Sequence, residues 1–319
     1  LGLNIVPGRH GAQNCEAWWK RGQPCPVVTA YGVDPALFIA ATQVYAREES
    51  ELDAAGGLAG EPMLITAADL SDLPVPARAE LVIEGFVHKG DVELEGPLGE
   101  FHGYYSGKSD MRAVIRVERV HLRPNPILTA ALMATWPSCE IGEYHAIMRS
   151  ARVWDNLEAM GVPGIAGVYV YPASASAAGL MVISIKQLYP GHVAQVLALA
   201  AQCPAAAYVI RWIVAVDDDV DPTDIGEVMW AMSVHSNPAD DIDILRKTWS
   251  YRTDPSLAPD MRPYGSKALI DACRSHRYRA THPKRTRLSR AVYERVAARW
   301  PEFGLPGEAP VITHFHDDQ

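Results

Sequence analysis

The sequence predicts a mixed α/β protein in two parts, because its hydrophobic pattern changes near the tripeptide Pro124-Asn125-Pro126. Before this point, short segments in which apolar and polar residues alternate indicate an antiparallel barrel or sheet with inserted helices. After it, helical periods alternate with apolar strands, which is typical of a layered α/β domain. We therefore expect one domain over residues 1–130 and a second over residues 131–319.

The first part is expected to contain strands and two short helices. The strand candidates are residues 26–32, 79–87 and 111–123. Asp34 followed by Pro35 predicts the start of one helix, because aspartate caps a helix and proline suits its first turn. Ser50 with Asp53 predicts the start of the other in the same way. The first domain is therefore expected to consist of short strands and helices joined by polar turns.

The second part is expected to alternate helices with strands. The helix candidates are residues 140–160, 192–203, the segment after Asp221-Pro222, and 288–300; the strand candidates are 164–172, 180–188 and 207–217. This order predicts a sheet with helices packed against it.

Composition excludes several classes of function. The chain has 29 lysines and arginines against 38 aspartates and glutamates, and the net charge of −9 argues against non-specific nucleic-acid binding. The five cysteines are widely spaced and never form a C-x-x-C pair, so neither a disulfide framework nor a zinc knuckle is indicated. No stretch resembles a signal peptide or a membrane span. We expect a cytoplasmic protein without membrane or nucleic-acid partners.

The hexapeptide Glu95-Gly96-Pro97-Leu98-Gly99-Glu100 is the most suggestive stretch. Its two acids are five positions apart, a spacing that neither a strand nor a helix directs to one point. A turn built on two glycines and a proline could do so. Paired carboxylates in one pocket have separated pKa values, which suits acid–base chemistry. The alternative is a solvated turn between strands.

Residues near the N-terminus suggest a metal site. His10 lies in the segment PGRH, and Glu51 begins the second predicted helix. An imidazole and a carboxylate together suit manganese or magnesium, although His10 could equally be an ordinary turn residue. The common nucleotide, hydrolase and zinc-protease motifs are absent from the sequence.

Four segments together resemble the UbiD family of reversible decarboxylases, which depend on prenylated FMN. They are LEGPLGEFHGYYSG at 94–107, GVDPALFIAAT at 32–42, LAGE at 58–61 and GSKALIDAC at 265–273. The resemblance runs in order over nearly the whole chain. It implies a split β-barrel of the flavin-reductase type followed by an α/β dimerisation domain.

The resemblance also implies a cofactor site. His10 and Glu51 match the family's ligands for a divalent metal, usually Mn²⁺ with Mg²⁺ as the alternative, which holds the cofactor phosphate beside a K⁺ ion. Lys267 matches a lysine that reaches this phosphate, and Arg9 stands where side chains touch substrate or cofactor. These four residues are the expected cofactor-binding set.

Catalytic and substrate-binding roles follow from the same resemblance. Glu95 and Glu100 match the two acids of a Glu-Arg-Glu group. We expect Glu100 to donate a proton, with its pKa raised by a dry pocket or by the charge of Glu95. Glu95 is expected to pair with the arginine and to orient the substrate carboxylate. Phe101, Tyr144 and Met148 match positions that line the substrate pocket.

The departure from the family concerns an N-x-x-x-x-R stretch that precedes the metal histidine. It carries the third metal ligand and the catalytic arginine, and it lies outside this sequence, which begins at Leu1. We therefore expect that the family's N-terminal domain is missing and that this chain alone is not a competent decarboxylase.

The expected activity is the reversible non-oxidative decarboxylation of an aromatic, heteroaromatic or α,β-unsaturated acid. The expected partners are a flavin prenyltransferase that supplies the cofactor and further copies of the chain, in a homodimer or a hexamer built of dimers. Two alternatives stay open: a flavin-binding split-barrel oxidoreductase, and a non-catalytic assembly subunit.

Overall fold

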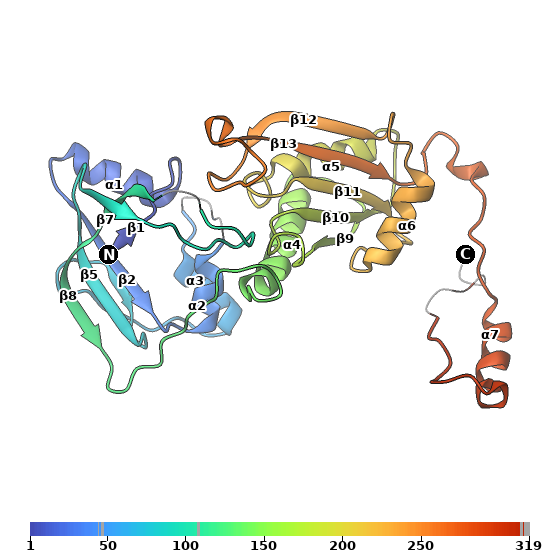
Figure 1. Cartoon of the computed structure of the whole chain (residues 1–319), viewed down its shortest axis with the longest axis horizontal. Helices are drawn as coiled ribbons and strands as arrows, with labels where there is room; N and C mark the ends of the chain where they lie inside the picture. The colour runs from blue at the N-terminus through green and yellow to red at the C-terminus, as the bar shows by residue number, and fades with distance from the viewer. Residues whose placement is uncertain (44, 46–47, 107–108, 313–314, 316–319) are drawn as a thin grey trace. The chain divides into compact units, whose positions relative to one another are not determined.

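The structure is a computed structural model that describes residues 1–43, 45, 48–106, 109–312 and 315 (Figure 1). It divides into two compact units, Leu1–Cys273 and Arg274–Gln319. The first unit contains almost all of the strands and helices, and it holds every residue predicted to form the site.

The N-terminal part of the first unit contains small antiparallel sheets. One sheet has the order β2 (Cys25–Tyr31), β5 (Leu81–Val87) and β8 (Arg116–Leu122); another has the order β1 (Gly2–Leu3), β7 (Asp110–Val114) and β6 (Val92–Glu95); and β3 (Ile65–Ala67) pairs with β4 (Pro74–Pro76). In the described residues these strands form no closed barrel. The mixed α/β class is confirmed, and the split barrel stays a prediction.

The single strand predicted over residues 111–123 is wrong, because the chain breaks there into β7 and β8. The break falls at Ile115, which is only 2% exposed and packs with Cys15, Cys25 and Val87. β7 pairs within one sheet and β8 within the other, so the chain passes between sheets at this residue. Apolar residues recur at positions 111, 113, 115 and 117, across the break, which is why the pattern alone did not reveal it.

Three helices accompany these strands: α1 (His10–Lys20), α2 (Pro35–Ala41) and α3 (Glu51–Ala59). Both predicted helix starts are confirmed. The backbone N–H of Ala36 donates to Asp34 Oδ1 at 2.8 Å, and that of Leu52 donates to Ser50 Oγ at 3.2 Å. These bonds satisfy amides that have no partner within their own helix. Helix α1 was not predicted, because PGRH looked like a turn.

The second part of the same unit is built on one mixed five-stranded sheet. The elements in chain order are α4 (Ile141–Ala159), β9 (Ile165–Val170), β10 (Leu180–Ile185), α5 (His192–Gln202), β11 (Trp212–Asp217), α6 (Ile225–His235), β12 (Ile242–Trp249), the short 3₁₀ helix Pro259–Met261 and β13 (Tyr264–Ala272). The strand order is β12-β13-β11-β10-β9; β10, β11 and β13 are parallel, and the two edge strands are antiparallel to their neighbours. The predicted alternation of helices and strands is confirmed, whereas β12 and β13 were not predicted.

The sheet is covered on both faces (Figure 1). Along β10, Met181 and Ile183 belong to a core shared with α4 and α5, whereas Val182 between them belongs to a core shared with α6. Successive side chains of a strand point to opposite faces, so an uninterrupted apolar strand requires apolar partners on both sides. Because both faces of the sheet are buried, the apolar clusters on its two sides form the largest core among the described residues.

The second unit contains α7 (Arg290–Ala297) between the short 3₁₀ helices Arg279–Thr281 and Trp300–Phe303. Ser289 caps α7, since its Oγ accepts the backbone N–H of Val292 at 3.3 Å. Among the described residues, no helix combines the length and the hydrophobicity that a membrane crossing requires.

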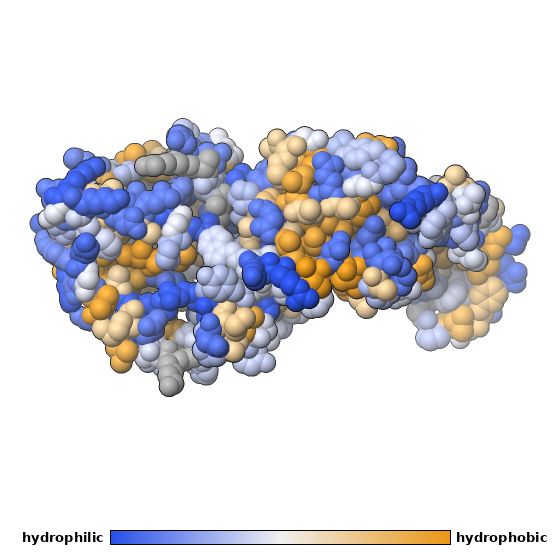
Figure 2. Space-filling model, turned by 90° about the horizontal axis from the view of Figure 1, so that it is seen from above, coloured by the Kyte–Doolittle hydropathy of each residue, from blue (hydrophilic) through white to orange (hydrophobic). Residues whose placement is uncertain are grey.

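Apolar side chains also reach the surface, among them those of Leu64, Ile127 and Val311. On the face seen in Figure 2, apolar and charged residues are intermixed. Much of the surface of an ordinary folded protein is contributed by apolar atoms, so these scattered side chains do not by themselves indicate a partner.

Two positions on α4 test the contribution of the sheet core. Leu157 is fully buried in it, whereas Ile147 on the same helix is 68% exposed. Leu157→Ala is expected to lower the free energy of unfolding by about 2–5 kcal/mol, because it leaves a cavity. Ile147→Ala should change it by about 0.5 kcal/mol or less. Urea unfolding followed by circular dichroism measures both, and equal losses would contradict the assignment of the core.

Candidate active site

The hexapeptide forms a hydrogen-bonded loop directly after β6. Gly96 has φ +86°, a left-handed conformation that favours glycine. Its carbonyl accepts the Ser109 hydroxyl at 2.7 Å, and the backbone N–H of Leu98 donates to Ser106 Oγ at 3.1 Å. Gly99 is also required, since a Cβ there would lie 2.7 Å from the carbonyl oxygen of Met133. The two acids therefore lie at the ends of a loop whose backbone is held by the side chains of Ser106 and Ser109.

Glu95 is the last residue of β6 and is half-buried. Its backbone lies opposite that of Asp110 in the antiparallel pairing of β6 with β7. Its carboxylate lies so close to Gly2 of β1 that a Cβ at Gly2 would overlap Glu95 Oε1. The carboxylate of Glu95 is thus packed against the backbone of the N-terminal strand.

Glu100 is half-buried at the other end of the loop. Burial raises the pKa of its carboxyl group, and the charge of Arg112 opposes this rise. The direction agrees with the expectation for a proton donor. The cause is burial, whereas the charge of Glu95, the other expected cause, does not contribute.

The guanidinium of Arg9 contacts two aromatic rings, and one of them, Tyr208, lies within electrostatic reach of Glu100. The guanidinium of Arg9 lies 5.2 Å from the ring centroid of Trp249 and 5.7 Å from that of Tyr208, and the two rings are 4.6 Å apart. Burial raises the pKa of Tyr208; the charge of Glu100 raises it further and that of Arg9 lowers it. Glu100 and Arg9 therefore act on the same phenol, although they are far apart in sequence.

A second set of rings holds the residues that follow Glu100. Phe101 packs edge-to-face on Tyr251 at 5.2 Å, and His102 stacks on the same ring at 5.9 Å. The hydroxyl of Ser176 donates to the Phe101 carbonyl at 2.8 Å. Burial lowers the pKa of His102, and the charges of Arg211 and Arg262 add to this effect.

Tyr251 is itself held in place by a buried ion pair. Arg211 lies over its ring at 5.5 Å and forms an ion pair with Asp254, which is fully buried. Asp254 also accepts hydrogen bonds from the hydroxyls of Ser250 and Ser256, each at 2.8 Å. A buried carboxylate requires such partners, and here they fix the segment that follows β12.

The remaining predicted residues lie in three places. His10 and Glu51 are the first residues of α1 and α3, and both are half-buried. Tyr144 packs against Phe38 at 5.6 Å, and Met148 lies one turn further along α4. Burial raises the pKa of Tyr144 to about 12.

Lys267 is buried in β13, where its Nζ donates to the Ala206 carbonyl at 2.9 Å. Burial lowers its pKa to about 8. Of the predicted residues, Arg9, Glu100 and Phe101 therefore share one aromatic neighbourhood, Tyr144 and Met148 share a helix, and Lys267 has its hydrogen bond within the α/β part.

Sequence reasoning missed Tyr208, Trp249, Tyr251 and His102. The only signal was the aromatic spacing in TWSY, where Trp249 and Tyr251 flank a serine. Nothing in that spacing indicates that the rings contact Arg9 and Phe101, more than a hundred residues earlier.

Two family models match the chain in succession. The 3-octaprenyl-4-hydroxybenzoate carboxy-lyase Rift-related domain matches residues 1–136, and the C-terminal domain of the same carboxy-lyase matches residues 144–272. The chain is 34% identical over 277 residues to the phenolic acid decarboxylase of Streptomyces sp. (strain D7), covering 85% of this chain and 56% of that protein. The phenolic acid decarboxylase of Bacillus subtilis (strain 168) is 33% identical over 278 residues, with the same coverage.

Solved structures agree with these matches. The UbiD-class enzyme HmfF from Pelotomaculum thermopropionicum, in complex with FMN, superposes with a TM-score of 0.77 at 28% identity, covering 90% of this chain and 61% of that one. The vanillic acid decarboxylase of Sedimentibacter hydroxybenzoicus in its closed form gives a TM-score of 0.82 at 26% identity, covering 94% and 63%.

These matches define an α/β chain of the carboxy-lyase type that both family models describe. The chain belongs to the UbiD family, as the resemblance predicted. It spans a little over half the length of the curated relatives, 56% in each case.

The environment of Glu100 can be tested by titration. We expect its carboxyl group to titrate above the ordinary glutamate pKa of 4.5, because burial disfavours the charged form. Arg112→Gln should raise this pKa further by removing a cation that stabilises the carboxylate. Carbon-13 NMR of carboxyl-labelled glutamate measures both values, and loss of the signal in Glu100→Gln assigns it. Arg119→Gln, which removes the partner of Asp69, is the control and should leave the signal unchanged.

Proposed function

We propose that this chain forms the cofactor- and substrate-binding part of a prenylated-FMN-dependent enzyme that decarboxylates an aromatic, heteroaromatic or α,β-unsaturated acid reversibly and without oxidation. The observation that carries the proposal is the placement of Glu100, a half-buried acid with a raised pKa that directly precedes Phe101, which packs on the ring of Tyr251. Because the chain spans about half the length of its curated relatives, the proposal concerns its share of the enzyme.

Glu100 would hold the proton that replaces carbon dioxide on the substrate. A raised pKa keeps more of the carboxyl group protonated, which is the form that donates. Glu95, at the other end of the loop, would orient the substrate carboxylate together with an arginine. Prenylated FMN, when bound, supplies the electron sink that decarboxylation requires.

The N-terminus of α1 fits the phosphate of such a cofactor. No side chain caps this helix, so its first amides remain available to an anion, and Arg9 adds a positive charge at the same end. His10 is the first residue of this helix and Glu51 the first of α3; an imidazole and a carboxylate suit Mn²⁺ or Mg²⁺. We propose that these two residues hold the metal, with K⁺ beside it, and that Lys267 serves the phosphate.

The relatives support an aromatic acid as the substrate. Those matched in sequence are named phenolic acid decarboxylases, and one solved neighbour is a vanillic acid decarboxylase. Phe101 and Tyr144 are aromatic and Met148 is polarizable, which suits the walls of a pocket for a flat ring.

The proposal extends to the assembly. It includes a split β-barrel of the flavin-reductase type within residues 1–130, dimerisation through residues 131–319, and a homodimer or a hexamer built of dimers in the cytoplasm. A flavin prenyltransferase would supply the cofactor.

Co-expression with a flavin prenyltransferase tests the central proposal. The ultraviolet-visible spectrum of the purified protein should show the prenylated flavin, and an added phenolic or benzoic acid should release carbon dioxide. A spectrum of ordinary FMN that is bleached by a hydride donor would favour an oxidoreductase instead. An oligomer without chromophore would favour an assembly subunit.

The role of Glu100 is tested by substitution in the active holoenzyme. Glu100→Gln should lower kcat by at least about a hundredfold while the flavin remains bound, because glutamine cannot donate the proton. Glu118→Gln, at an exposed position on β8, is the matched control and should retain normal turnover. Turnover retained in Glu100→Gln would remove the proton-donor assignment.

The pH dependence of kcat follows from the raised pKa of Glu100. A proton donor must be protonated, so activity should persist below this pKa and fall as the pH rises through it. Arg112→Gln should move this high-pH limb to higher pH, because the charge of Arg112 lowers the pKa of Glu100. Steady-state rates measured between pH 4 and pH 9 would show the shift, and an unmoved limb would exclude Glu100 as its origin.

A further inference from the structure

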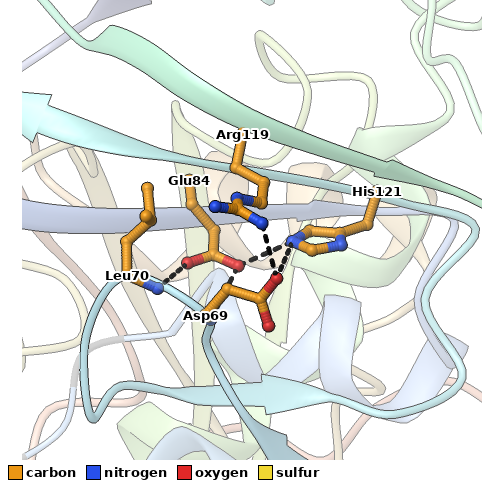
Figure 3. A network of polar contacts seen from close by, with 5 residues as sticks. All are labelled: Asp69, Leu70, Glu84, Arg119 and His121. Carbon is orange, nitrogen blue, oxygen red and sulfur yellow. Dashed lines mark hydrogen bonds and ion pairs between the residues drawn. The ribbon is translucent and has the colours of Figure 1, made fainter.

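Three potential metal ligands converge beside the β2-β5-β8 sheet, away from the acid loop in sequence (Figure 3). Asp69 lies between β3 and β4, Glu84 lies on β5 and His121 on β8. One ligand atom from each residue lies within 4.8 Å of the other two. None of these residues belongs to the sites described above.

Glu84 forms the buried base of this cluster, since it is only 2% exposed. Its Oε1 accepts the backbone N–H of Asp69 at 3.1 Å, and its Oε2 accepts that of Leu70 at 2.9 Å. These bonds, together with His121, lower the pKa of Glu84 against the effect of burial. The two backbone amides therefore fix the carboxylate in position before any ion arrives.

His121 places one ring nitrogen between the two acids. Its Nε2 is 2.7 Å from Glu84 Oε1 and 3.9 Å from Asp69 Oδ2. Both contacts involve His121 Nε2, so a cation bound to this atom would lie close to both carboxylates. Figure 3 shows the three side chains pointing toward one another, with Arg119 beside Asp69.

A cavity of about 410 Å³ opens on the cluster. All three ligands line it, together with Glu80 and Arg123, which pair with each other at 2.9 Å. The size lies within the range of small-molecule sites. An ion could therefore reach the ligands and retain a free coordination position toward the cavity.

We propose that Asp69, Glu84 and His121 form a binding site for a divalent transition-metal ion such as Zn²⁺. One imidazole nitrogen and two carboxylate oxygens give three protein ligands of the types that zinc binds. A site of this composition binds Zn²⁺ more tightly than Mn²⁺ or Fe²⁺. The fourth position faces the cavity and takes water or a small anion. His121 binds through Nε2, with its proton moved to Nδ1.

Small movements complete the geometry. Zinc bonds of about 2.0–2.2 Å in a tetrahedron separate neighbouring ligand atoms by roughly 3.3 Å. The contact of His121 with Glu84 must therefore lengthen and that with Asp69 must shorten, each by about half an ångström. The side chains of Asp69 and His121 are largely exposed, so rotation about their own bonds suffices.

Arg119 gives the site a distinctive signature. Its Nη1 lies 3.2 Å from Asp69 Oδ2, so the guanidinium competes with a metal ion for this ligand. Removing the guanidinium of Arg119 would keep all three metal ligands and remove the competing positive charge. Arg119→Gln is thus expected to strengthen zinc binding, which a merely structural role for the cluster does not predict.

The test is Zn²⁺ binding measured by equilibrium dialysis. The whole chain carries His10→Gln, so that the proposed cofactor metal site cannot contribute. One Zn²⁺ per chain is expected. Asp69→Asn and His121→Gln should each raise Kd by about tenfold or more, and Arg119→Gln should lower it. His88→Gln removes an exposed histidine outside the cluster and should change Kd by less than about twofold.

Two further measurements decide the outcome. Circular dichroism should show that each variant remains folded, as expected for substitutions of exposed side chains. X-ray absorption at the zinc edge should show one imidazole and only light ligands otherwise. Absence of stoichiometric zinc in the His10→Gln chain would overturn the site. An unchanged Kd in both Asp69→Asn and His121→Gln, relative to the His10→Gln chain, would also overturn the site.

Discussion

The ion pair between Arg211 and the fully buried Asp254 anchors the segment against which Phe101, the residue after Glu100, packs. A buried carboxylate without a partner is strongly destabilising, so Arg211 and two serine hydroxyls must remain in place around Asp254. Arg211 in turn supports the ring of Tyr251, against which Phe101 packs. The position of the residues next to Glu100 is therefore set by an ion pair that lies in the α/β part.

The same arrangement accounts for the chemistry proposed for Glu100. Burial makes its carboxyl group a weaker acid, while the charge of Arg112 limits the effect. Arg9, held by Tyr208 and Trp249, places a positive charge close enough to act on the same phenol as Glu100. A carboxyl group with a raised pKa, a cation and aromatic rings thus occur in one part of the chain.

The two proposed sites use different sheets of the N-terminal part. Glu95 ends β6 in the β1-β7-β6 sheet, whereas Glu84 lies on β5 in the β2-β5-β8 sheet. The chain passes from one sheet to the other at Ile115. The carboxylate of Glu84 accepts backbone amides from the segment between β3 and β4, whereas that of Glu95 packs against Gly2 of β1, so the two carboxylates have different backbone partners.

Local interactions are what the sequence by itself determined. The caps of α2 and α3 were predicted, because each depends on residues two positions apart. The turn from Glu95 to Glu100 was also predicted from its glycines and proline, whereas its hydrogen bonds to Ser106 and Ser109 were not. Helix α1, strands β12 and β13, and the break at Ile115 were not, because burial against distant segments decides them. The same holds for the rings around Arg9 and for the cluster of Asp69, Glu84 and His121. Only the tertiary structure brings such residues together, since contacts across many residues of chain leave no periodic signal in the sequence.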